Sequence, residues 1–239
     1  MSQMLKSSGA MAAATLTSRL LGMVREIVYA KFMGTGWVAS AFFLAFQVPN
    51  LFRRLLGEGA LTAAFIPIFK EKEKRDGETA MWQAANAVIS GLLVVTTIIV
   101  VAGFIALSLV LHYRGPELHA RTLLVLQLLR IMMPYLLLVC LTAVFMGMLN
   151  ARGHFFIPAL GAATLNFVMI ASVIWLAPKF GREVHEKVFA LAFGVVLAGI
   201  VQTWFQLPSL YREGFRYRWV TPWRDEMVRR VGNQPDGYI

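Results

Sequence analysis

The sequence predicts an all-α membrane protein, a polytopic bundle of six transmembrane helices. Of the 239 residues, 58% are apolar and only 15% are charged, and the mean hydropathy is +0.63. Six apolar stretches each reach the length of about 20 residues that a helix needs to cross a bilayer. Soluble domains are about half apolar and a quarter charged. The composition therefore excludes a disordered chain and argues against a soluble enzyme.

The six stretches give the expected helices in order. They cover residues 10–33, 38–69 with a bend, 85–111, 123–149, 156–177 and 188–210. Together they form one expected domain over 1–211, and a basic tail follows over 212–239. Arg19 and Arg25 interrupt the first stretch where the core of a signal peptide would be uniformly apolar, so we expect this helix to be retained. The alternating pattern of membrane β-strands is absent, so the spans are predicted to be helical.

The distribution of basic residues predicts that both chain ends are cytoplasmic. With the N-terminus inside, the inside connectors and the tail hold twelve Lys and Arg residues, against six outside. The net charge of +10 would then lie mostly against anionic membrane lipids. No basic module interleaved with aromatic residues is present, so we expect no nucleic-acid partner. The single cysteine, Cys140, excludes a disulfide framework, and the histidines lack metal-ligand spacing, so we expect no metal and no cofactor.

The first stretch carries charges inside the membrane. An arginine at mid-bilayer costs about 2.5–3.5 kcal/mol and usually faces a bundle interior or a watery cavity. On a helical wheel, one arc of about 120° holds the polar and small residues, which are Thr15, Ser18, Arg19, Gly22, Arg25 and Glu26. We expect this arc to line a polar cavity. The alternative is that Arg25 or Glu26 reaches the headgroups, and Glu26 is either a partner of Arg25 or a charge at the outer edge.

The second stretch is too long for one straight span. An unbroken helix over 38–69 would measure about 48 Å, against a hydrocarbon core of about 30 Å. Residues that weaken or bend a helix lie inside it, namely Pro49, Asn50, Gly57 and Gly59. Transporters place substrate sites at such discontinuous helices. The alternative is a helix that ends at Phe52 and is followed by a second, amphipathic segment.

Three arginines on the first two helices predict an anionic ligand. Arg53 adds a third cation to Arg19 and Arg25, and guanidinium groups bind phosphate in a bidentate manner. Neither a catalytic triad pattern nor a phosphate-binding Walker loop is present, so no catalytic residue is expected.

Polar residues in the later stretches are assigned smaller roles. Arg130 and Gln127 lie in the outer half of the fourth stretch, where an interfacial position is favoured. Asn166, Gln202 and Gln206 are typical of hydrogen bonds between membrane helices rather than of ligand contacts.

Several motifs follow one another along the chain to about Arg230. They are Ser18-Arg-Leu-Leu-Gly-Met-Val-Arg-Glu, Ala41-Phe-Phe-Leu-Ala-Phe, Pro49-Asn-Leu-Phe-Arg-Arg-Leu-Leu-Gly-Glu-Gly-Ala, Pro134-Tyr-Leu-Leu-Leu, Met148-Leu-Asn-Ala-Arg-Gly-His-Phe-Phe-Ile-Pro-Ala and Leu165-Asn. Together these motifs resemble the MurJ/MviN lipid II flippase family.

The resemblance implies a transporter and not an enzyme. Members of this exporter superfamily have fourteen helices in two lobes and work by alternating access. The family moves lipid II, an undecaprenyl-pyrophosphate-linked peptidoglycan precursor, across the bacterial cytoplasmic membrane. The six predicted helices would correspond to the N-terminal lobe. By resemblance, the substrate-binding positions are Arg19, Arg25, Arg53 and Glu58.

The chain departs from the family pattern in two ways. Ser40 stands where the family usually has an aspartate before the Ala-Phe-Phe motif, so a charge-balancing role there is lost or moved. The sequence also stops after six predicted spans, so the second lobe needed for full transport is missing from it. Two alternatives stay open: a related exporter of another lipid-linked oligosaccharide, and a truncated fragment or membrane scaffold that transports nothing.

Overall fold

The computed structural model describes residues 2–53 and 60–221, and the side chains of 2–12, 53, 60–64 and 162 lie outside the description. Within these ranges the chain is helical and contains no strand. The helical membrane fold predicted from the composition is therefore confirmed.

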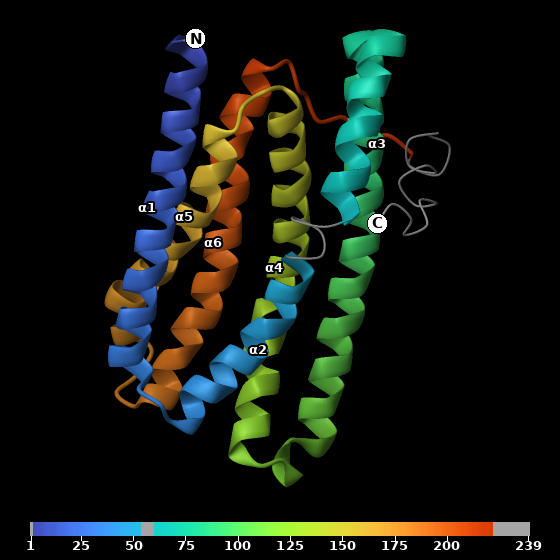
Figure 1. Cartoon of the computed structure of the whole chain (residues 1–239). Helices are drawn as coiled ribbons and strands as arrows, with labels where there is room; N and C mark the ends of the chain where they lie inside the picture. The colour runs from blue at the N-terminus through green and yellow to red at the C-terminus, as the bar shows by residue number, and fades with distance from the viewer. Residues whose placement is uncertain (1, 54–59, 222–239) are drawn as a thin grey trace.

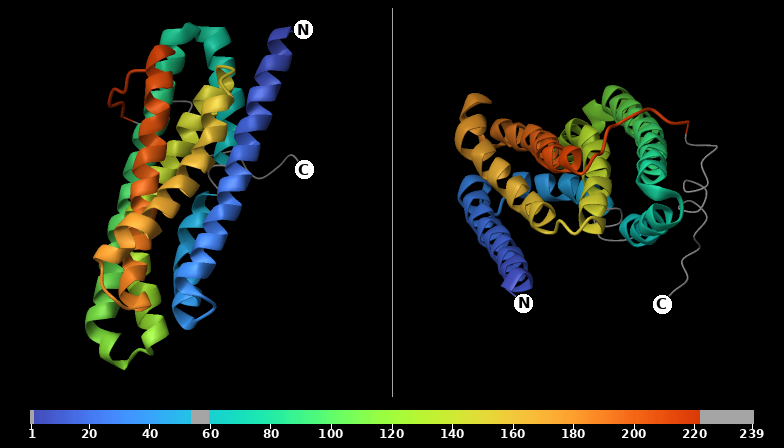
Figure 2. Two further views of the ribbon diagram at one scale, coloured as in Figure 1. Left: turned by 90° about the vertical axis from the view of Figure 1, so that its left-hand side faces the viewer. Right: turned by 90° about the horizontal axis from the view of Figure 1, so that it is seen from above.

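Six α-helices run up and down the bundle in the described part of the chain (Figure 1). They are α1 (Ser2–Met33), α2 (Trp37–Arg53), α3 (Ala60–Arg114), α4 (Ala120–Ala151), α5 (Phe156–Ala171) and α6 (Val184–Arg212). Short 3-10 turns follow α3 and precede the α6 connector, and a π-helical turn, Ser172–Leu176, extends α5. α1 lies at one edge of the bundle and α3 at the opposite edge (Figures 1 and 2). Between these edges, α4 contacts α2, α3 and α6.

The α3 helix folds back on itself at Gly77. The backbone there has φ 86° and ψ 173°, a conformation that glycine adopts without a steric penalty. Two limbs, 60–76 and 78–114, result, and the ring of Phe69 packs edge-on against Trp82 at 5.5 Å. The expected connector between the second and third spans is therefore this helical hairpin.

The expected helix over 38–69 falls in two described elements. Its first part is α2, which continues through Pro49 to Arg53, and its last part belongs to the first limb of α3. Residues 54–59 between them lie outside the described residues, so the bend and the alternative of a helix ending at Phe52 both stay predictions. The expected third helix lies inside the second limb of α3, and the remaining three lie within α4, α5 with its short turns, and α6.

Four helical stretches among the described residues are long and apolar enough to cross a membrane. They are Phe65–Glu117, Ala120–Ala151, Phe156–Lys179 and Val184–Arg212, and Trp37–Phe52 is a shorter apolar helix. α1 is less apolar because four charged side chains fall within its second half, namely Arg19, Arg25, Glu26 and Lys31. The number of six spans stays a prediction.

The interior is held by close packing and small residues. Tyr135 on α4 is fully buried, and a β-carbon added at Gly199 on α6 would lie only 2.7 Å from its ring. Large apolar side chains such as Leu16, Ile98 and Trp204 are instead more than half exposed, as expected for surfaces that face lipid. Lipid provides no hydrophobic force between helices, so close packing of neighbouring helices supplies much of the free energy of their association.

An ion-pair network ties together the end of the bundle that holds the Gly77 hairpin. Arg152, just after α4, donates from Nε to Glu213 Oε2 at 2.7 Å and also pairs with Glu73 and Glu78 on the two limbs of α3. Glu213 follows α6, and its Oε1 lies 2.7 Å from His154 Nε2. The hydrogen bond from Arg152, helped by His154, holds the pKa of the Glu213 carboxyl below its ordinary range. The network therefore joins α3, the α4–α5 turn and the end of α6.

Replacing Arg152 by Gln should lower the free energy of unfolding by about 1–2 kcal/mol, since charged hydrogen bonds are lost but solvent screens part of the effect. Thermal unfolding of the purified chain in detergent measures this. The matched control is Arg114→Gln, because Arg114 forms only an exposed pair with Glu117 and its loss should change the midpoint little. An equal change in both variants would contradict the assigned role of Arg152.

The network should also make stability depend on pH. Because folding lowers the pKa of Glu213, its contribution is fully present above the ordinary carboxyl range and is lost as pH falls through the folded pKa. Thermal midpoints are measured from neutral pH to below about 4. Over this range the midpoint should fall less in the double variant His154→Gln/Glu213→Gln than in the single variant His154→Gln. Using His154→Gln as the reference keeps residue 154 identical in the two variants, so they differ only at position 213. Parallel pH profiles would show that Glu213 is not the titrating group.

Candidate functional site

Asn166 of α5 is the centre of the contact between α1 and α5. Its side chain is 7% exposed, its Nδ2 donates to the Ser18 carbonyl oxygen at 3.0 Å, and its Oδ1 accepts from Arg25 Nη1 at 2.9 Å. A β-carbon at Gly22 would lie 3.4 Å from Asn166 Nδ2, so the absence of a side chain there leaves room for the amide. Ser18, Gly22 and Arg25 thus form one edge of the predicted polar arc, and this edge packs on α5.

Arg25 is held on several sides and keeps one polar group without a partner. Its guanidinium pairs with Glu26 and lies over the ring of Tyr29, 5.6 Å from the centroid. The Arg25 side chain is 22% exposed, whereas that of Glu26 is 56% exposed. Arg25 Nε is buried and makes no hydrogen bond within the described part of the chain. Of the two roles left open for Glu26, the structure shows the partner of Arg25.

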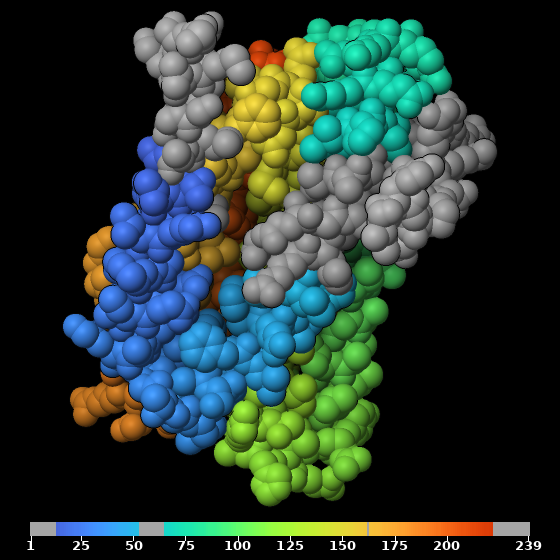
Figure 3. All heavy atoms as spheres, in the orientation of Figure 1, coloured from blue at the N-terminus to red at the C-terminus, as the bar shows by residue number. Residues whose placement is uncertain are grey.

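The other edge of the polar arc is exposed. Thr15, Arg19 and Glu26 all lie at the surface of α1, and among the described residues none forms an ion pair with Arg19. α1 and α2 diverge from the short turn that joins them (Figure 1). The space-filling view shows this face of the molecule hollowed between the two helices (Figure 3). The arc is therefore divided between a helix contact and an open surface.

The second group of predicted residues is only partly described. Pro49 is buried in α2 and Asn50 is half-buried next to it, while Arg53 is the last residue of α2 and its side chain lies outside the description. The predicted residues Gly57, Glu58 and Gly59 lie outside the described residues altogether. The described contacts therefore join Arg25 to α5, and they do not test whether Arg53 lies near Arg19 and Arg25. Ser40 is exposed at the start of α2.

The predicted amides of α6 differ in what they contact. Gln202 donates to the carbonyl oxygen of Gly161 on α5 at 2.6 Å, whereas Gln206 donates to the Gln202 carbonyl oxygen of its own helix at 3.4 Å. Thr142 and Thr203, which were not predicted, join α4 to α6 at 3.0 Å. Asn166 does more than was predicted for it, because it also positions Arg25. An amide inside an apolar stretch was the available signal, but only the fold shows which charge it meets. The described residues contain no cluster of His, Cys, Asp or Glu placed to hold a metal ion.

Comparison with known proteins extends this description. A family model described as lipid II flippase MurJ matches residues 29–235. The lipid II flippase MurJ of Burkholderia cenocepacia is 35% identical over 203 residues, which cover 82% of this chain and 38% of that protein. The probable lipid II flippase MurJ of Bdellovibrio bacteriovorus is 36% identical over 244 residues, covering 99% of this chain and 46% of the relative.

A solved structure shares the fold. It is described as lipid II flippase MurJ in an inward closed conformation, with a TM-score of 0.75 and 24% identity, and the match covers 93% of this chain and 46% of that one. The chain thus spans less than half the length of these proteins. Since the family model covers most of the sequence, the chain belongs to the lipid II flippase MurJ family, whose members are membrane transporters and not enzymes, and it is a multi-pass protein of the inner membrane.

Proposed function

We propose that this chain is the N-terminal lobe of a flippase that carries lipid II from the cytoplasmic to the periplasmic leaflet, and that α1 binds the pyrophosphate of the substrate. The observation that carries the proposal is the position of Arg25. It is part-buried at the contact of α1 with α5, is hydrogen-bonded to Asn166, has an Nε without a partner among the described residues, and shares a helix with the exposed Arg19.

The barrier to flipping is the charge of the substrate headgroup. Moving an unpaired anion from water into hydrocarbon costs tens of kcal/mol by simple solvation estimates. Guanidinium groups lower this cost because they bring permanent charge and several N–H donors that match phosphate oxygens. The proposed action is binding and guidance, and no covalent step is involved. The polyprenyl tail stays in the lipid while the headgroup crosses the membrane in contact with the arginines.

The hollow between α1 and α2 supports a cavity on this face. A second lobe, which the matched relatives have room for, would close the hollow from outside. The proposal keeps Arg53 and Glu58 as substrate-binding positions because of the resemblance of their motif; Glu58 and the side chain of Arg53 lie outside the described residues. Pro49 and Asn50 in α2, with Gly57 and Gly59 after it, are the proposed flexing points during alternating access.

The proposed orientation has both ends of the chain in the cytoplasm. The N-terminal end of α1, the Gly77 hairpin, the α4–α5 turn and the end of α6 all lie at one end of the bundle (Figure 1). This end carries most of the connector Lys and Arg residues, which favours the cytoplasmic side.

The test is to deplete the flippase of a bacterial host and to express this chain alone or joined to the second half of the Burkholderia cenocepacia relative. We expect the fusion, and not the chain alone, to restore growth, because the cavity needs both walls. Membrane insertion and folding are checked in parallel. A folded and inserted fusion that fails to restore growth would contradict the flippase proposal.

Within the fusion, Arg19→Ala, Arg25→Ala and Arg53→Ala should each abolish rescue. Each loses a charge-assisted contact of about 1.5–3 kcal/mol, a factor of roughly ten or more in binding. Growth of the depleted host measures the effect. Arg212→Ala is the matched control, because Arg212 is an exposed basic residue at the end of α6 and its loss should leave rescue intact. Rescue by the Arg25→Ala fusion would separate Arg25 from substrate binding.

Asn166→Leu should weaken binding of undecaprenyl pyrophosphate by about tenfold, since Arg25 loses the acceptor that positions it. Native mass spectrometry of the purified chain with this lipid measures the affinity. Gln202→Leu is the control: it removes another amide contact to a neighbouring helix but touches no arginine. It should lower the thermal midpoint and leave affinity unchanged. Equal affinities for the Asn166 variant and the unmodified chain would contradict a positioning role.

A further inference from the structure

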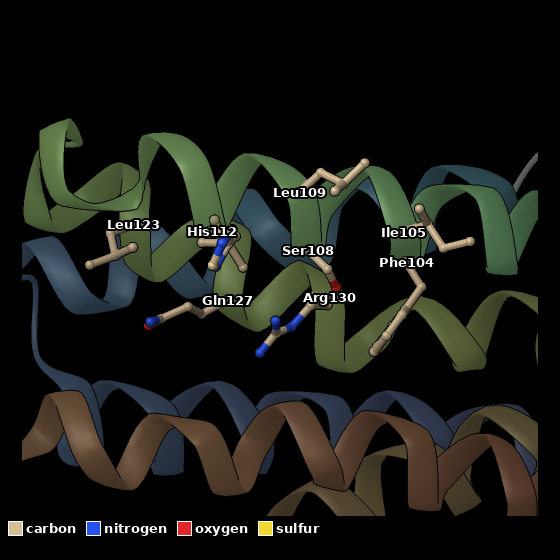
Figure 4. A pocket seen from close by; sticks show the side chains of 9 residues that line it. Phe104, Ile105, Ser108, Leu109, His112, Leu123, Gln127 and Arg130 are labelled. Atoms are coloured by element: carbon tan, nitrogen blue, oxygen red, sulfur yellow. The ribbon is translucent and has the colours of Figure 1, made fainter.

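A second candidate binding site lies far along the chain from α1. A cavity of about 640 Å3 opens between the second limb of α3 and the first turns of α4 (Figure 4). This volume lies within the range of about 300–1,000 Å3 found for ligand sites. Its apolar wall includes Phe104, Ile105 and Leu109, all of which are exposed at 46–53%.

The polar lining of this cavity is cationic and contains no carboxylate. Gln127 and Arg130 project from α4 to the same side, with Ser108 and His112 of α3 beside them (Figure 4). The Arg130 guanidinium lies 5.9 Å from the centroid of the Phe104 ring. Within the part of the chain that the structure describes, no acidic side chain pairs with Arg130. The nearby Glu117 is bound to Arg114.

Arg130 therefore has an unbalanced charge near the edge of the hydrocarbon core. It lies about 15 Å along α4 from the start of that helix, which has 32 residues and measures about 48 Å against a core of about 30 Å. Its backbone is therefore close to the outer boundary of the core, where an arginine side chain reaches the level of the lipid phosphates. The α3–α4 turn holds further basic residues, Arg114 and Arg121, against the single carboxylate of Glu117. Charge complementarity thus calls for an anion that can reach the cavity from the membrane.

We propose that the cavity binds an anionic phospholipid, whose phosphate contacts Arg130 and Gln127. His112 and Ser108 border the headgroup, and an acyl chain lies along Phe104, Ile105 and Leu109. A lipid fits better than a soluble ion because most of the lining is apolar and faces outward, where only hydrocarbon can cover it. The site is separate from the proposed pyrophosphate site, since none of its lining residues belongs to α1 or α2.

The experiment is native mass spectrometry of the purified 239-residue chain with dioleoylphosphatidylglycerol as the anionic lipid. We expect Arg130→Gln to weaken binding about tenfold, or about 1.4 kcal/mol. Arg130→Lys should retain most of the affinity because it keeps the charge. Arg121→Gln is the matched control: it removes the same charge from the same end of the bundle but from a residue outside the cavity. It should leave the affinity unchanged.

Two further arms define the ligand. Dioleoylphosphatidylcholine, which has no net charge, should bind more weakly, and inorganic phosphate at the lipid concentration should not displace the anionic lipid. Ile105→Asn, at an exposed position, should weaken lipid binding even if Arg130→Gln proves unstable.

Equal losses of affinity in Arg130→Gln and Arg121→Gln would overturn the proposal in favour of diffuse surface charge. Displacement by inorganic phosphate would overturn the lipid assignment. Neither result bears on flipping, which the growth test examines separately.

Discussion

The structure depends on one constraint: a polar or charged group inside an apolar bundle needs a partner. Asn166 shows how the constraint organises the fold. A single amide accepts from Arg25, donates to the backbone at Ser18, and so fastens α1, the least apolar helix, to α5. Without that contact α1 would leave Arg25 without the acceptor that Asn166 supplies. The interaction that attaches the helix is therefore also the one that orients the guanidinium proposed to bind substrate.

The same constraint acts differently at the ends and in the middle of the bundle. At the Gly77 end, three carboxylates surround Arg152, so charges are balanced within the protein and join segments distant in sequence. In the middle, contacts are few and are made by amides and hydroxyls, such as Gln202 with Gly161. Arg19 and Arg130 lack carboxylate partners in the described residues. Balanced charges hold the fold together, and unbalanced charges mark the places where an anion is expected.

The polar face of α1 was predictable because a helix fixes the angles between its own residues. The arc from Thr15 to Glu26 follows from the 100° step alone, while its role in lining a substrate cavity stays a prediction. The expected bend in 38–69 stays a prediction, because Pro49 lies inside α2 and residues 54–59 lie outside the description. Gly77, which lies in the expected connector, is the point where α3 reverses. Proline and glycine weaken a helix locally, but packing against neighbouring helices decides which weak point is used.

The sequence by itself determined the membrane class, the order of the apolar helices and the charged face of α1, because these properties depend on hydropathy and on contacts short in sequence. Only the tertiary structure decided which distant residues form contacts. Arg25 is hydrogen-bonded to Asn166, 141 residues away, and Arg152 pairs with Glu73, Glu78 and Glu213. Arg130 borders a cavity between α3 and α4. The physical reason is that pairings between helices are set by how closely the surfaces approach, and many combinations of apolar helices satisfy the same hydropathy pattern.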